Sequence, residues 1–456
     1  MRKLILAIIC LTTLAGCSVS KVCREPQIEL PEYLIADMTQ DSTCIADLTW
    51  MELFADTFLI DLIDQALSYN KDLLTASARI CQYEHLHRIA RADRFPSIDL
   101  KAHAEREATH PHGSDFSEKI EANAQLALAW EVDFFGRIHW ADKRAMAAYL
   151  QTIEARRALQ MTLVSQVATS YYELIALDRE LEIVKRTLVT RNENLTQAKL
   201  RFEGGLTSEI PYQQAQVEYA KTAAMVPDLE KKIKLKENEI SLLTGRLPSS
   251  INRSLKKDIT IPQDMLHVGL PSDIIKRRPD VREAQEQLKE AMAQVGHDWA
   301  DRFPRFVINL SGGFENNDFA HLFTSPITYM VGELAAPIFA FGKRKAKYEA
   351  AIDAYEATRF QYEERVLQAF KEVNDAITSY NSAEENTRLM NDLKTSARKY
   401  VELARFQYLN GQINYMDVLD AQRTYFNAEI NQSNAIRDQL LALINMYKAL
   451  GGGWNE

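Results

Sequence analysis

The chain has 456 residues, of which 46% are hydrophobic and 26% are charged, and its formal net charge at pH 7 is −9. This composition excludes wholesale disorder, and the length is sufficient for two or more ordinary domains. The lack of a basic surplus argues against nucleic acid as a partner.

The first sixteen residues predict a bacterial export signal. A positive start, Arg2-Lys3, precedes an apolar run at residues 4–14 that is too short to span a bilayer as a mature helix. Leu-Ala-Gly then comes directly before Cys17, and this string resembles a lipobox, the signal for cleavage before a cysteine that becomes lipidated. We therefore predict a lipoprotein signal peptide over residues 1–16 and lipidation of Cys17.

The mature chain is expected to begin with a lipidated N-terminal segment over residues 17–49. Ser18 follows the lipidated position, in place of the Asp that typically retains such lipoproteins in the inner membrane, so an anchor in outer-membrane lipid is expected. Stable anchoring needs more than one acyl chain, and a lipoprotein cysteine carries enough. Cys23 and Cys44 could pair in an oxidising periplasm, but with Cys81 the count is odd and no disulfide follows from it.

The mature chain also carries an internal duplication. Four pairs of segments match in the same order at offsets of 206 to 208 positions: 70–73 with 278–281, 92–96 with 300–304, 135–137 with 341–343, and 198–216 with 404–422. Such agreement predicts two structural repeats, over residues 50–260 and residues 261–456.

Each repeat is predicted to contain one very long helix. Residues 137–203 and residues 343–410 contain neither Gly nor Pro, and at 1.5 Å per residue each run can extend about 100 Å. In the first run an apolar residue recurs at every seventh position from Val167 to Phe202. This strict repeat predicts a coiled-coil seam.

A tight turn at the tip is expected to end each long helix. Residues that accept left-handed backbone stand there, namely Gly204, Gly205, Asn410 and Gly411. After each turn the chain is expected to return as a helix. Pro227 is expected to kink or break the first of these returns.

Between the Phe-Pro and Phe-Gly motifs of each repeat the hydrophobic period changes from helix to strand. The alternation predicts four strands, at about residues 96–109, 119–134, 304–316 and 327–340. The strands alone favour a soluble sheet, but the lipoprotein signal and the lack of an apolar run long enough for a membrane helix favour strands in a membrane. Four strands cannot close a barrel and an open edge cannot face lipid, so several chains would have to share one barrel.

These residues resemble the TolC-like outer-membrane factors, in the lipoprotein branch that serves tripartite efflux pumps. The resemblance covers nearly the whole mature chain, and it is carried by residues 50–73, 95–98, 130–137, 270–273, 277–280, 419–423 and 447–454. It implies an α+β membrane protein of two tandem repeats, each with long antiparallel coiled-coil helices and a two-stranded β-hairpin. It also implies a homotrimer that forms a twelve-stranded transmembrane β-barrel and a periplasmic α-helical barrel.

The resemblance implies an outer-membrane channel that passively conducts small toxic molecules from the periplasm to the exterior. A duct has no energy source, so a periplasmic adaptor (a membrane fusion protein) and an inner-membrane transporter are expected partners. A type I protein-secretion duct of the same fold and a periplasmic coiled-coil structural lipoprotein without a pore are the alternatives. No enzymatic activity, metal or cofactor other than the lipid is expected. No catalytic motif is present, and the candidate metal-binding histidines His85, His87, His110 and His112 are scattered.

A polar cluster at the second tip is the predicted periplasmic gate, formed by Tyr408, Asp417 and Asp420. The two acids lie three residues apart on one helix face, and all three positions match residues that constrict the periplasmic entrance in the family. In a trimer the acids would form a ring that selects cations and responds to pH. The alternative for Asp417 is to stabilise a helix start. Glu209 and Pro211 stand where the family can place an acidic partner for the tyrosine, which argues against an inter-helix lock through Tyr408.

Overall fold

A computed structural model describes the chain in two compact units. The described residues are 23, 26, 45–54, 56–109, 112–113, 117–254, 276–336 and 340–454, so the signal peptide, Cys17 and Cys44 lie outside them. Of the described residues, the strand unit comprises those within segments 78–154 and 282–365, and the helical unit comprises those within segments 45–77, 155–281 and 366–454. Each unit therefore draws on both repeats.

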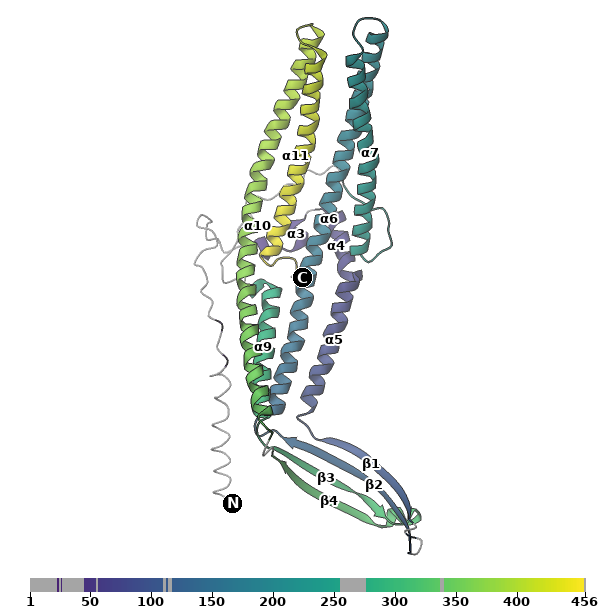
Figure 1. Cartoon of the computed structure of the whole chain (residues 1–456), viewed down its shortest axis with the longest axis vertical. Coiled ribbons are helices and arrows are strands. Elements are labelled where there is room, and N and C mark those ends of the chain that lie inside the picture. Colours follow the sequence, from purple (N-terminus) through teal and green to yellow (C-terminus); the bar gives the residue numbers. More distant parts are fainter. Residues whose placement is uncertain are drawn as a thin grey trace. The chain divides into compact units, whose positions relative to one another are not determined.

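The strand unit contains one antiparallel sheet with the strand order β1-β2-β3-β4 (Figure 1). Its strands are β1 (Ser97–Thr109), β2 (Ser117–Val132), β3 (Arg305–Asn316) and β4 (Pro326–Ala335). The strands β2 and β3 come from different repeats, and they pair from Ala122 opposite Asn316 to Val132 opposite Phe306. The two predicted hairpins are thus joined into one sheet, with β1 and β4 at its edges.

One face of this sheet is apolar across all four strands. The register places Leu100 opposite Leu126, Leu128 opposite Leu310, and Leu310 opposite Met330. Leu100 is 75% exposed and Met330 is 79% exposed. The described chain therefore leaves this apolar face uncovered, which is unusual for a sheet that packs on its own core.

Each hairpin lies between an entering helix and a very long departing helix. The entering helices are α5 (Lys71–Ala92) and α9 (Pro279–Ala300), and each ends shortly before a Phe-Pro pair, because proline cannot continue a helix. The departing helices are α6 (Arg137–Glu203) and α10 (Lys343–Leu409), each 67 residues long. Gly136 and Gly342 precede them with φ of 81° and 80°, a conformation that favours glycine.

In the helical unit α7 (Ile210–Leu243) and α11 (Tyr415–Ala449) return along α6 and α10 (Figure 1). Val184 of α6, Leu229 of α7 and Phe426 of α11 form a buried cluster. Helix α7 continues through Pro227, so of the expected kink or break the break is wrong and the kink stays a prediction. Val226 packs against this cluster beside the proline, and such packing offsets the backbone hydrogen bond that proline cannot make.

The chain that leads into this unit is fastened by hydrogen bonds. It contains η1 (Ile45–Asp47), α3 (Trp50–Leu53) and α4 (Thr57–Tyr69). Asp56 caps α4 by accepting the N–H of Phe58 at 2.9 Å, and it also accepts the O–H of Tyr171 at 2.8 Å. Burial raises the pKa of Tyr171 above its ordinary value, with the charge of Asp56 acting in the same direction. The phenol therefore stays protonated and holds α4 to α6.

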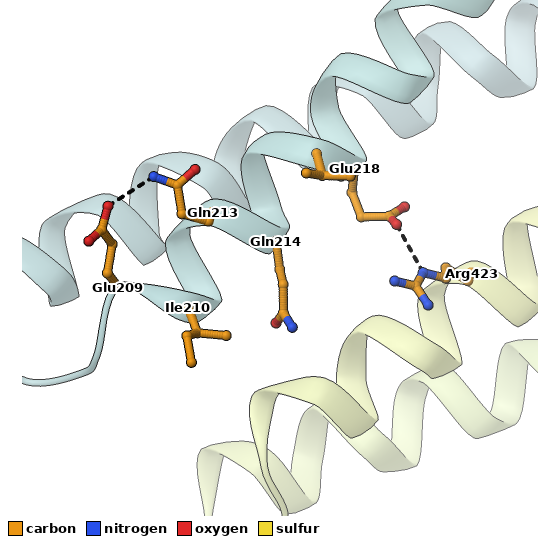
Figure 2. Close-up of a pocket in the computed structure, with 7 residues that line it drawn as sticks. Glu209, Ile210, Gln213, Gln214, Glu218 and Arg423 are labelled. Atoms are coloured by element: carbon orange, nitrogen blue, oxygen red, sulfur yellow. Dashed lines mark hydrogen bonds and ion pairs between the residues drawn. The ribbon is translucent and has the colours of Figure 1, made fainter.

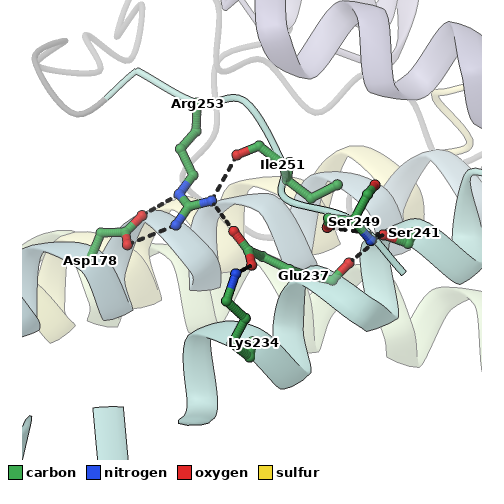
Figure 3. A network of polar contacts seen from close by, with 7 residues as sticks. All are labelled: Asp178, Lys234, Glu237, Ser241, Ser249, Ile251 and Arg253. Carbon is green, nitrogen blue, oxygen red and sulfur yellow. Dashed lines mark hydrogen bonds and ion pairs between the residues drawn. The ribbon is translucent and has the colours of Figure 1, made fainter. Parts of the chain in front are cut away.

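An ionic network holds residues 249–254 across α6 and α7 (Figure 3). The Arg253 guanidinium donates to Asp178 of α6 at 3.0 Å and to Glu237 of α7 at 2.7 Å. Glu237 also accepts from Lys234 at 2.7 Å. The side chains of Asp178 and Glu237 are 12% and 4% exposed, so Arg253 neutralises two nearly buried carboxylates.

The described residues also bear on three features of the sequence. None of their helices combines the length and the apolar character needed to cross a membrane. Cys23 and Cys81 are free thiols, the first buried and the second exposed. In the part of the chain that the structure describes, no three His, Cys, Asp or Glu side chains gather as a metal site.

Candidate gate at the helix tips

Two turns of the same design end the long helices. Gly205 and Gly411 have φ of 69° and 72°, and the residue after each donates its N–H to the carbonyl five positions back. This left-handed ending satisfies helix carbonyls that would otherwise lack donors. The predicted tip residues Gly204, Gly205, Asn410 and Gly411 all lie in these turns. We call α6 with α7 the first tip hairpin, and α10 with α11 the second.

The two acids of the predicted gate lie exposed on the first two turns of α11. Asp417 accepts the backbone N–H of Asn414 at 3.0 Å, so it stabilises the start of the helix, as the alternative interpretation expects. Asp420 accepts a longer hydrogen bond of 3.4 Å from the hydroxyl of Tyr400 on α10. Neither contact neutralises a carboxylate, so both charges are available at the second tip.

Tyr408 connects the two tip hairpins. Its hydroxyl accepts a hydrogen bond from Arg201 near the end of α6, whose guanidinium lies 5.6 Å from the ring centroid. The ring also lies 5.8 Å from that of Tyr415. The sequence argued against an inter-helix lock through Tyr408 with an acidic partner. The partner of Tyr408 in the structure is instead a basic residue of the other hairpin, Arg201.

A nearly buried contact between the hairpins centres on Glu218 of α7. Its carboxylate lies 2.6 Å from Arg191 of α6. It also lies 3.0 Å from Arg423 of α11 (Figure 2). The side chains of Glu218 and Arg191 are 9% and 10% exposed. Burial lowers the pKa of Arg191, whereas the charge of Glu218 acts in the opposite direction. One nearly buried carboxylate thus contacts guanidinium groups of both hairpins, that of Arg191 nearly buried and that of Arg423 48% exposed.

Further polar contacts extend this seam along the hairpins. Arg186 of α6 pairs with Glu429 of α11 at 2.6 Å, and Asn194 donates to Gln422 at 3.0 Å. Beside Glu218 a hollow of about 450 Å³ lies between α7 and α11 (Figure 2). Residues lining the hollow are Glu209, Ile210, Gln213, Gln214, Val217, Glu218 and Arg423.

Sequence reasoning missed Arg191, Arg201 and Glu218, together with the role of Arg423. Charged residues on long helices are ordinarily solvated, and Glu218 has an uncharged counterpart, Thr424, in the other repeat. Only the packing of α6, α7 and α11 shows that its carboxylate is buried between two cations.

Known proteins resemble this chain along nearly its full length. A family model described as outer membrane efflux protein matches residues 62–246 and 270–452. The solvent efflux pump outer membrane protein SrpC of Pseudomonas putida is 32% identical over 415 residues, which cover 89% of this chain and 87% of SrpC. The probable efflux pump outer membrane protein TtgC of Pseudomonas putida is 30% identical over 457 residues, or 97% and 94% of the two chains.

Solved structures share the fold. The outer-membrane channel OprN superposes with a TM-score of 0.85 at 26% identity, covering 95% of this chain and 99% of OprN. The open state of the Neisseria gonorrhoeae MtrE outer membrane channel superposes with a TM-score of 0.83 at 26% identity, covering 94% and 97%.

Proposed function

Since the chain belongs to the outer membrane efflux protein family, we propose that three copies form a gated channel that conducts small toxic molecules out of the periplasm. The repeated α+β fold, the efflux function and the outer-membrane location that the sequence predicts are confirmed. The relative SrpC is named for solvent efflux, and this supports small apolar cargo over secreted proteins.

The exposed sheet is the observation that best supports the proposed channel. Its apolar face suits contact with lipid, and β1 and β4 present edges to which the described chain adds no further strand. An unpaired backbone group in lipid costs several kcal/mol, so copies must join edge to edge. Three copies with four strands each would close a twelve-stranded barrel. A periplasmic structural lipoprotein without a pore does not account for such a sheet.

The contacts between the tip hairpins support a gate in each copy. Glu218 and the pair of Arg201 with Tyr408 hold the first tip hairpin to the second. In a trimer, Asp417 and Asp420 of three copies would surround one axis at the entrance. Opening would then require the hairpins to separate, and the acidic ring would select cations while the tip is closed.

The partners we propose are a periplasmic adaptor and an inner-membrane transporter. The named relatives are outer-membrane proteins of efflux pumps, and a passive channel needs an energised partner to move cargo against a gradient. We propose no catalytic role for any residue and no cofactor other than the lipid on Cys17.

Neutralising the acidic ring tests the gate. The double variant Asp417→Asn with Asp420→Asn keeps hydrogen-bonding oxygens, and thus the start of α11, but removes both charges. We expect weaker block by divalent cations and a larger leak through the closed channel in planar bilayers, because no anionic ring remains to hold cations. Asp438→Asn, at an exposed ion pair further along α11, is the matched control. Unchanged conductance and unchanged cation block in the double variant would refute the gate.

Replacing the lipidated cysteine tests the anchor. With Cys17→Ser we expect no acyl mass on the purified protein and retention of residues 1–16, because processing requires the cysteine. Each lost methylene removes about 0.8 kcal/mol of membrane affinity. Intact-mass measurement reads both changes, and Cys81→Ser, at an exposed free thiol, is the control. A Cys17→Ser protein with acyl chains still attached would place the lipid on another residue.

A further inference from the structure

A second hollow lies in the helical unit, where α3, α4 and the start of α5 meet α6. Its volume is about 340 Å³, which is within the size range of sites for small molecules. An apolar part of its wall comes from Trp50, Leu67 and Leu73. Trp50 is 5% exposed and Leu73 is 2% exposed, so packing in the core fixes these two side chains. The hollow therefore has an apolar wall of defined shape.

Three polar side chains without partners also line this hollow. Asp64 lies on α4, and Arg156 and Gln160 lie one turn apart on α6. The Nε atom of Arg156 donates to the hydroxyl of Ser77 at 3.0 Å, which orients the guanidinium group. Within the described residues, the terminal nitrogens of Arg156 and the side chains of Asp64 and Gln160 have no hydrogen-bond or ion-pair partner. The hollow thus presents an anion, a cation and an amide to a ligand.

The helix packing that the two repeats share does not require these polar side chains. The offset of 206 positions between α6 and α10 makes Tyr362 the counterpart of Arg156 and Val366 the counterpart of Gln160. Tyr362 is 9% exposed and Val366 is 0% exposed. In the second repeat these positions therefore belong to the core, whereas in the first repeat they carry polar groups that line a hollow.

The two opposite charges determine which ligand the hollow suits. Asp64 and Arg156 are both described, and they form no ion pair with each other. Each therefore needs an opposite charge once a ligand displaces the water around it. A ligand with one charge would be attracted by one of these side chains and repelled by the other. A zwitterion with an apolar body satisfies both charges and the apolar wall.

We propose that this hollow binds a free amino acid with an apolar side chain. The ammonium group of the ligand pairs with Asp64. Its carboxylate accepts hydrogen bonds from Arg156, whose planar guanidinium group suits a carboxylate, and from the amide of Gln160. Its side chain packs against Trp50 and Leu67. The site adds a binding function to the proposed channel and does not depend on the gate, whose residues lie at the helix tips.

Three related compounds test whether the site recognises a zwitterion. Calorimetry measures the binding of L-leucine, N-acetyl-L-leucine and L-leucinamide to the full-length protein in detergent. Acetylation removes the ammonium charge, and amidation removes the carboxylate charge. We expect saturable binding of L-leucine and at least about tenfold weaker binding of each derivative, because each loses one charged hydrogen-bonded contact. Equal affinity for L-leucine and either derivative, or no saturable binding of L-leucine, would overturn the proposal.

Two variants test which residue binds each charge of the ligand. Asp64→Asn should weaken the binding of L-leucine at least about tenfold and abolish the preference for L-leucine over N-acetyl-L-leucine. Arg156→Gln should weaken it to a similar extent and abolish the preference for L-leucine over L-leucinamide. Variants that weaken all three compounds alike would contradict the assigned contacts, because a distorted hollow does not distinguish between the compounds.

Asp61→Asn is the matched control on the same helix. Asp61 is exposed, accepts a hydrogen bond from Gln65 at 2.7 Å and does not line the hollow, so its replacement should leave the binding of L-leucine unchanged. An equal loss of binding in Asp61→Asn and Asp64→Asn would overturn the assignment to the hollow. The titrations require no pore, so their outcome is independent of the conductance measurements that test the gate.

Discussion

Replacing Glu218 with Ala is expected to open the helix tips and raise the single-channel conductance of the assembled protein. Its carboxylate neutralises Arg191 of the first tip hairpin and Arg423 of the second, at a site where Glu218 and Arg191 are nearly buried. Without the carboxylate, the two guanidinium groups repel each other across the seam. Breaking a buried charge pair costs about 3–5 kcal/mol, and about 3 kcal/mol shifts a closed-to-open equilibrium by about 10²-fold.

A matched control lies on the same helix. Glu230 of α7 pairs with Lys185 of α6 at 2.9 Å, and both side chains are more than half exposed. Exposed pairs contribute about 1 kcal/mol or less, so Glu230→Ala should leave conductance unchanged. Planar-bilayer recordings compare the single-channel conductance of the two variants. Circular dichroism checks that both variants keep their helices. Parental conductance in a folded Glu218→Ala channel would mean that this seam does not hold the tip.

Replacing Arg253 with Ala is expected to lower the free energy of unfolding of the helical unit by about 3–5 kcal/mol. The change removes the cation that neutralises Asp178 and Glu237, two nearly buried carboxylates. Glu237 then keeps one hydrogen-bonded cation, the exposed Lys234. The change also removes the contacts of Arg253 with α6 and α7, while Ser249 keeps its hydrogen bonds to Ser241 of α7. Urea unfolding followed by circular dichroism measures the loss. Arg388→Ala, which removes the exposed pairs of Arg388 with Glu385 and Asp392 on α10, should cost about 1 kcal/mol or less for each pair.

The same network should make stability depend on pH. Burial opposes the ionisation of Glu237, but hydrogen bonds from Lys234 and Arg253 hold its pKa below the ordinary value of 4.5. Its stabilisation is therefore complete above the unfolded pKa and is lost as the pH falls through the lower folded pKa. Acid unfolding of the parent should be steeper below pH 4.5 than that of Arg253→Ala. If the parent and Arg253→Ala unfold with the same dependence on acid pH, the network does not contribute to the pH dependence of stability.

Local patterns in the sequence determined most of the architecture. Absence of Gly and Pro specified α6 and α10, and the glycines at 205 and 411 specified the turns that end them, because these are properties of backbone conformation. Alternation specified the strands, since side chains of a strand point to opposite faces. The duplication then related one half of the chain to the other.

Only the tertiary structure decided which residues hold the tips together and how the hairpins join. Helix α7 continues through Pro227 because residues beside the proline pack against α6 and α11. The stabilisation from this packing cannot be read from the local sequence. Glu218 differs from an ordinary solvated glutamate only because Arg191 and Arg423, distant in the sequence, enclose it. Burial and pairing depend on which residues lie across the interface, and a linear pattern does not carry that information.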